Sequence, residues 1–194
     1  MRLLLTTLAV LAVLTTAGCT DDSNGDTLPT AEDTHPLPTV ASPGARLCDF
    51  VDRDSVRSVL GTDDFSGDGS VDKDSAGTVS GAQCLVTVAG QDSSALAVRL
   101  VYNMGYARKD FDASLKDDTK HQLPADQGLG YSWTEGDAGH TWIGHGNYLL
   151  QVDVTGAAKG RDPEQDAVAL GQQVLTTLQL PSDWTLRGTP SPSR

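Results

Sequence analysis

Apolar residues after position 50 recur with the spacing of a short helix. Val56, Val59 and Leu60 lie at positions i, i+3 and i+4, which places their side chains on one helical face. Asp52 stands at an N-cap position before this run, and Gly61 follows it as a C′ glycine. The pattern therefore predicts a short helix between Asp52 and Gly61.

Further along, apolar and polar residues alternate as they do in strands with one buried face. The segments QCLVTVA and SALAVRLVY are separated by Gly-Gln-Asp-Ser at 90–93, which predicts a hairpin. Three more strands are predicted in GLGYSWTE, HTWIG and NYLLQVDV, and the last of these has the clearest alternation. Residues 62–82, rich in Gly, Ser and Asp, are predicted to form a mobile loop.

Two more helices are expected. The first of them is indicated by Ala107, Phe111 and Leu115, which are spaced by four. The last helix opens at Asp162 as N-cap with proline at N1, carries an apolar side, and ends before Pro181. The expected order is αββ–αβββ–α. It predicts a two-layer α+β domain over 47–180, with an antiparallel sheet of about five strands and the helices on one face.

The first 18 residues are typical of an export signal. One arginine precedes an apolar run that is shorter than the roughly 20 residues of a membrane-spanning helix, and small residues follow it. The sequence TAGC at 16–19 resembles the bacterial lipobox, which implies cleavage after residue 18 and acylation of Cys19. The protein would then be anchored to the outer face of the cell membrane. An ordinary secretory signal that ends near a cysteine is the alternative.

The segment 19–46 is rich in Pro, Thr and Asp and is expected to be a disordered tether between lipid and domain. The segment 181–194 is expected to be a C-terminal tail, with Trp184 and Leu186 as candidates for docking on the domain.

Three cysteines are an odd number for an exported chain. Acylation of Cys19 would leave Cys48 and Cys84, and two such residues outside the cytoplasm usually pair. A disulfide is therefore expected between them. A metal site or a reactive thiol is the alternative, although the chain has no CxxC motif.

Several segments together resemble a family of actinobacterial lipoproteins classed as domain of unknown function 3558. They are LCDFVDRDSVRSVLG, a later QC that opens a strand, LPADQGLGYSW, GNYLLQVDV and DAVALGQQVLTTL. The resemblance covers roughly residues 46–180. It implies a surface lipoprotein with a paired cysteine and supplies no catalytic residues.

The formal net charge of −12 argues against nucleic acid as a partner, because an acidic surface repels phosphate backbones. Asp72 and Asp74 begin a pattern like a calcium loop, but Gln83 stands where a bidentate Glu is needed. His140 and His145 point to opposite faces of a strand unless a bulge intervenes. No metal site and no cofactor are therefore expected.

The motifs GxSxG and HExxH do not occur in the sequence, which lowers the odds of an enzyme. Trp133 and Trp142 are expected to fill a core or, alternatively, to form a surface aromatic platform. The favoured hypothesis is a non-catalytic binding or sensing module of the cell envelope, with an unknown envelope ligand or protein partner. A carrier of an apolar, lipid-like ligand and an unrecognised cell-wall hydrolase are the alternatives.

Overall fold

The fold is mixed α and β, and a computed structural model describes residues 35–102 and 108–181 of it. In chain order the elements are β1 (Arg46–Leu47), β2 (Val51–Asp52), α1 (Arg53–Leu60), β3 (Phe65–Lys73), β4 (Val79–Val88), β5 (Leu96–Tyr102), α2 (Arg108–Ser114), β6 (His121–Gln122), a 3-10 turn η1 (Ala125–Gln127), β7 (Leu129–Glu135), β8 (Ala138–His145), β9 (Tyr148–Val154) and α3 (Pro163–Leu178).

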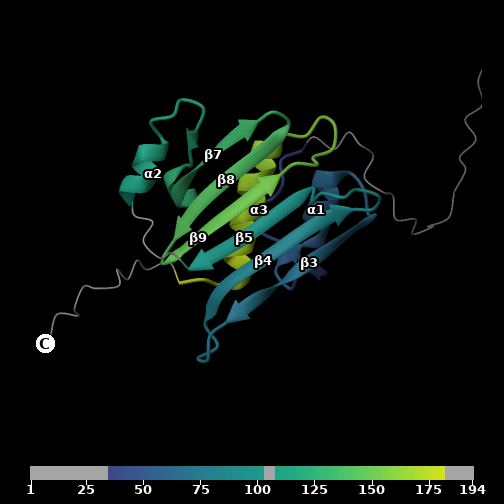
Figure 1. Cartoon of the computed structure of the whole chain (residues 1–194), viewed down its shortest axis with the longest axis horizontal. Coiled ribbons are helices and arrows are strands. Elements are labelled where there is room, and N and C mark those ends of the chain that lie inside the picture. The colour runs from purple at the N-terminus through teal and green to yellow at the C-terminus, as the bar shows by residue number, and fades with distance from the viewer. Residues whose placement is uncertain (1–34, 103–107, 182–194) are drawn as a thin grey trace, which may run out of the picture.

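One large antiparallel sheet dominates the described part of the chain. It has seven strands in the order β3-β4-β5-β9-β8-β7-β6, and β1 and β2 form a separate hairpin (Figure 1). The expectation of about five strands was therefore too low. The two strands that it missed are those at the edges of the sheet, β3 and β6.

The expectation of a mobile loop at 62–82 is wrong, because most of this segment forms strands. Residues 65–73 form β3 and pair with β4 along its length, apart from a register shift at Asp72 and Lys73. Most side chains of β3 are exposed on both faces, so the strand leaves no alternation in the sequence. An edge strand needs only backbone pairing with its neighbour, which Gly, Ser and Asp permit.

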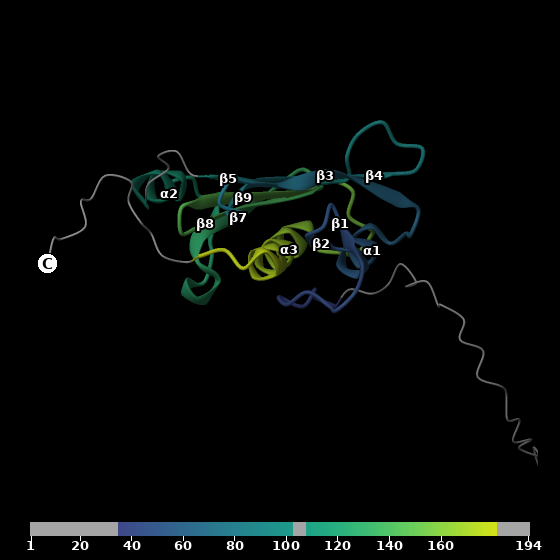
Figure 2. The ribbon, with the colours of Figure 1, turned by 90° about the horizontal axis from the view of Figure 1, so that it is seen from below.

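The helices do not all lie on one face of the sheet, contrary to expectation. Figure 2 shows α1 and α3 on the same side, with the β1–β2 hairpin beside them. On β8, Ile143 faces Gly171 of α3, whereas the next residue, Gly144, contacts the ring of Phe111 from α2. Because successive strand residues point to opposite faces, α2 packs on the face away from α3.

The main core lies between the sheet and the layer of α1 and α3. It contains the inward residues of β4, β5 and β9 and the apolar sides of the two helices. Both helices begin as the sequence predicts: Asp52 caps α1 and Asp162 caps α3. Gly61 ends α1 with a φ of 65°. On the opposite face, Phe111, Tyr131 and Leu149 form a smaller core.

A disulfide ties the β1–β2 hairpin to the sheet. The structure joins Cys48 in the turn to Cys84 on β4, with Cα atoms 5.6 Å apart. The turn holds Cys48 and Asp49 at positive φ angles of 53° and 72°. Gly67 of β3 lies beneath the bridge, where a Cβ would be 3.3 Å from the Sγ of Cys48.

The chain just before residue 47 also packs on the domain. Residues 35–45, which we call the strap, run along the outer side of α3. Gln173 Nε2 donates to the Pro38 carbonyl at 2.6 Å, and Leu37 packs against the core. Within 35–102 and 108–181, no helix is long and apolar enough to cross a bilayer. The expected export signal, Cys19, Trp184 and Leu186 lie outside the described residues.

Removing the disulfide should destabilise the domain. We expect the double substitution Cys48→Ser and Cys84→Ser to lower the free energy of unfolding by about 4 kcal/mol, because the unfolded chain gains the entropy of an open loop. Urea denaturation of the oxidised and reduced protein and of the variant measures this loss. The reduced protein should match the variant, and equal stability of all three would contradict the expectation.

Gly139→Ala should destabilise the contact between β8 and α3. A Cβ at Gly139 would lie 2.0 Å from the carbonyl carbon of Pro163, so the helix must move. We expect a loss of about 3 kcal/mol in the free energy of unfolding, as for severe overpacking. Gly136→Ala is the control: no atom lies within 4 Å of its Cβ and its φ is +60°, so only a backbone cost of about 1 kcal/mol remains. Equal losses in the two variants would show that the close approach does not matter.

Candidate functional site

The N-terminus of α3 lies close against the sheet and brings Glu164 to strand β7. Asp162 Oδ1 accepts hydrogen bonds from the backbone N–H groups of Glu164 and Gln165, which fixes the first turn. Gly139 of β8 allows this turn to approach, because the backbone of Pro163 and Glu164 occupies the place of a side chain there.

The Glu164 carboxylate joins α3 to two strands through three hydrogen bonds. Its Oε1 accepts from His121 Nδ1 and from Ser132 Oγ, each at 2.7 Å. Its Oε2 accepts from Thr134 Oγ1 at 2.9 Å. The Glu164 side chain is only 15% exposed, whereas that of His121 is 66% exposed. The carboxylate is therefore mostly buried, with solvent reaching it from the His121 side.

These hydrogen bonds keep Glu164 ionised. Burial alone would raise the pKa of Glu164, but the hydrogen bonds from His121, Ser132 and Thr134 outweigh it and leave the pKa below its ordinary value of 4.5. The hydrogen bond between His121 and Glu164, together with the negative charge of Glu164, raises the pKa of His121 above its ordinary value of 6.5.

The pair therefore stabilises the fold most on the acid side of neutrality. Because the pKa of His121 is raised, its contribution is complete below pH 6.5 and is lost as the pH rises through the folded-state pKa. Because the pKa of Glu164 is lowered, its contribution is present above pH 4.5 and is lost as the pH falls through the folded-state pKa.

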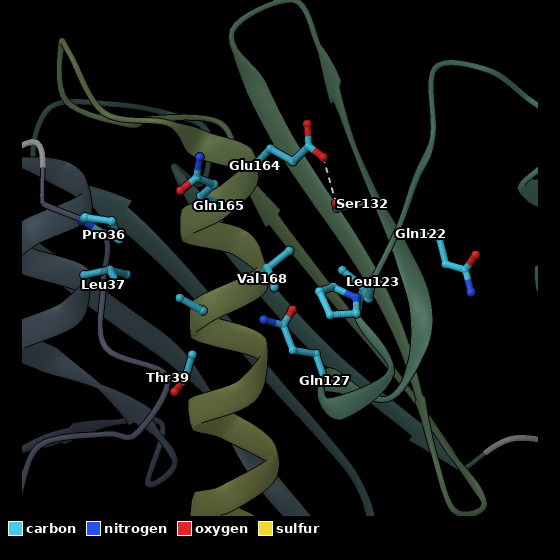
Figure 3. Close-up of a pocket in the computed structure, with 12 residues that line it drawn as sticks. Pro36, Leu37, Thr39, Gln122, Leu123, Gln127, Ser132, Glu164, Gln165 and Val168 are labelled. Atoms are coloured by element: carbon cyan, nitrogen blue, oxygen red, sulfur yellow. Dashed lines mark hydrogen bonds between the residues drawn. The ribbon is translucent and has the colours of Figure 1, made fainter.

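Glu164 stands at one end of a pocket of about 290 Å³. Figure 3 shows α3 as the floor, the strap along one side and the segment from β6 to η1 along the other. Val168 points from α3 toward Leu123, while Glu164 points toward Ser132 (Figure 3). The twelve lining residues are Pro36, Leu37, Thr39, Gln122, Leu123, Pro124, Gln127, Ser132, Glu164, Gln165, Val168 and Ala169.

The chemistry of the pocket is that of a binding site with one charged group. Its walls are mostly apolar, and three glutamines supply amide groups. A carboxylate that stays ionised at neutral pH is an acceptor of hydrogen bonds and a partner for cations, and it does not donate a proton there. Within the described residues, no group of three His, Cys, Asp or Glu side chains is placed to hold a metal ion.

A second depression, of about 550 Å³, lies at the other end of α3. Gln172 separates the two by donating from Nε2 to the Gln127 carbonyl at 2.7 Å. The lining of the second depression includes Asp126, which is exposed, and His145, whose Nε2 lies 3.2 Å from the Leu180 carbonyl. It contains no buried charged group comparable to Glu164, so the first pocket is the stronger candidate.

The two tryptophans of the predicted platform lie on neighbouring strands and on the face away from α3. Trp133 on β7 and Trp142 on β8 are half-buried, with ring centroids 6.2 Å apart. The ring of Trp133 stacks on His140 at 4.8 Å and also lies under the ammonium group of Lys120. Its contacts are therefore largely used within the protein, and a ligand platform here stays a prediction.

Other side chains considered from the sequence have local partners. His140 Nδ1 lies 2.7 Å from Asp153 Oδ1, and His145 points to the opposite face, as the strand period predicts. Asp74 Oδ1 accepts hydrogen bonds from the backbone N–H groups of Ala76 and Thr78, in the turn between β3 and β4. In the sequence, Glu164 follows the proline that opens the last helix, and no sequence signal connects it with His121 or Ser132.

Comparisons with known proteins give little support to any assignment. No family model matches the chain, and no curated protein matches it either. The crystal structure of a GTP binding regulator from Thermotoga maritima aligns with 72% of this chain and 96% of its own, at 11% identity and a TM-score of 0.33. A likeness this weak carries no argument about function.

Glu164→Gln should lower the pKa of His121 toward 6.5, because the substitution removes the negative charge and weakens the hydrogen bond. Titration of the imidazole nitrogen signals by NMR measures this pKa. Ser132→Ala is the matched control, since it removes one hydrogen bond from the same carboxylate and keeps its charge. We expect the pKa of His121 to stay raised in that variant. A His121 pKa unchanged by Glu164→Gln would show that the pair does not form.

Proposed function

We propose that this chain is a lipid-anchored protein of the outer face of the bacterial cell membrane and binds a small ligand without transforming it. The globular part is an α+β module of the cell envelope. The observation that carries the proposal is the pocket on α3, with its apolar walls and its single buried, ionised carboxylate.

The pocket has the composition of a ligand site. Such sites combine apolar walls with a few placed polar groups. Its volume of about 290 Å³ is at the lower end of the range of ~300–1,000 Å³ that encloses drug-sized ligands. A small ligand or one side chain of a partner fits this size better than the acyl chains of a lipid. This supports the binding module over the carrier of a lipid-like ligand.

The start of the sequence supports the location. The apolar run and TAGC at 16–19 resemble a lipoprotein signal, and two acyl chains on Cys19 would hold the protein durably, since each buried CH₂ contributes about 0.8 kcal/mol. The Cys48–Cys84 disulfide fits an oxidising compartment outside the cytoplasm. The family resemblance, to actinobacterial lipoproteins of unknown function, points the same way.

The packed strap shortens the proposed tether. Residues 20–34 would separate the acylated cysteine from the strap, and a coil of that length spans about 20 Å. The pocket would then lie near the bilayer, where it meets ligands at the membrane surface.

Cys19→Ser should release the protein from the membrane. We expect the wild-type protein to incorporate an alkyne-tagged fatty acid and to sediment with membranes, and the variant to lose the label and appear in the medium. Thr20→Ser is the matched control, because it changes the neighbouring residue and leaves both the acylation site and the disulfide intact. Label retained by the Cys19→Ser protein, or a wild-type protein that is unlabelled and soluble, would contradict the anchor.

A further inference from the structure

We infer that the pocket on α3 binds a primary ammonium group carried on a short apolar chain, with the ammonium group at Glu164 and the chain along Leu123 and Val168. This inference rests on the proposed function, because it names the ligand class of the same pocket.

The charge of the pocket selects a cation. Of the twelve lining residues that the structure describes, Glu164 alone has an ionisable side chain. The α3 dipole places about half a positive charge at this end of the helix. Glu164 and the N-cap carboxylate of Asp162 together outweigh it. Above its raised pKa, His121 is neutral and donates a hydrogen bond without adding charge, so a ligand that arrives at alkaline pH meets a net negative charge.

The polar groups at this end suit a primary ammonium group better than a quaternary one. An ammonium group donates three hydrogen bonds. The carboxylate of Glu164 is the charged acceptor at this end, and Gln122, Gln127 and Gln165 add polar side chains to the lining. Quaternary ammonium ligands are recognised by aromatic rings, and the twelve lining residues include no aromatic side chain.

The walls suit an apolar chain attached to that group. Leu123 is 5% exposed and comes from the segment between β6 and η1. Val168 faces it from α3, and Pro36 and Leu37 of the strap line the opposite side (Figure 3). A neutral or anionic head group on the same chain would gain the apolar contacts and lose the interaction with Glu164.

Four linear probes with different head groups test this inference. They are n-hexylamine, 1-hexanol, hexanoate and hexyltrimethylammonium, titrated at pH 8 into the secreted Cys19→Ser form of the full chain. This form keeps the described domain unchanged and has no acyl chain of its own to enter the pocket. The backbone and methyl NMR signals of Leu123, Val168 and Ala169 report binding at the site.

We expect hexylamine to bind about tenfold more tightly than hexanol, because a hydrogen bond to a charged group adds this much. Hexanoate and hexyltrimethylammonium should bind more weakly than hexylamine. Glu164→Gln should remove the tenfold advantage of hexylamine and leave the binding of hexanol unchanged, which also shows that the variant is folded. Glu135→Gln removes the same charge from an exposed position on β7 and should change nothing.

Two outcomes overturn the inference in different ways. If hexylamine and hexanol bind equally and Glu164→Gln has no effect, the pocket is an apolar site and the ammonium assignment is wrong, while the proposed binding function stands. If none of the probes shifts the signals of Leu123 and Val168, the pocket binds no such chain, and the proposed function fails together with the inference.

A lysine side chain and a free amine present the same chemistry. A capped Gly-Lys-Gly peptide and its acetyl-lysine counterpart distinguish these sources. Tighter binding of the lysine peptide than of hexylamine would assign the pocket to a polypeptide partner, and weaker binding would assign it to a free amine. Equal binding of the lysine and acetyl-lysine peptides would contradict the role of the positive charge.

Discussion

Helix α3 lies so close against β8 that Gly139 has backbone in the place of a side chain, and Gly171 has a side chain of the strand there. Gly139 contacts the backbone at the start of the helix, and Gly171 on the helix faces Ile143, whose Cδ1 would be 2.8 Å from an added Cβ. One glycine belongs to the strand and the other to the helix, so the two surfaces approach at both contacts. This close approach places Glu164 within reach of Ser132 and Thr134. The site depends on this close approach, because any side chain at position 139 would separate the Glu164 carboxylate from its donors.

The buried carboxylate also shows how polar groups hold this domain together. Burying an ionised carboxylate is unfavourable unless hydrogen bonds replace its hydration. Here three side chains from β6 and β7 supply these bonds to one residue of α3. The short edge strand β6 pairs with β7 over only two residues, and the bond from His121 adds a side-chain contact to that pairing. The polar network and the pocket wall are thus one structural unit.

The sequence predicted the elements that have a strong local signal. Asp52, Gly61 and Asp162 mark helix ends through capping, and the alternation of β9 reflects a strand with one face on the core. β3 was missed because exposed edge residues follow no apolar pattern. The face of the sheet on which α2 packs was not predicted, because the spacing that predicts this helix does not show which face Phe111 contacts. Glu164 and His121 are 43 positions apart, and only the tertiary fold brings them together.

The strap joins the pocket to the chain that precedes the domain. The contacts that hold it follow one another along the strap: Arg161 Nη2, just before α3, donates to the His35 carbonyl at 3.4 Å, Leu37 packs against the core, and Gln173 Nε2 donates to the Pro38 carbonyl. A pulling force on the preceding chain would break these contacts one after another, and not all together. Tension on that chain would therefore open one side of the pocket well before it disturbed the sheet.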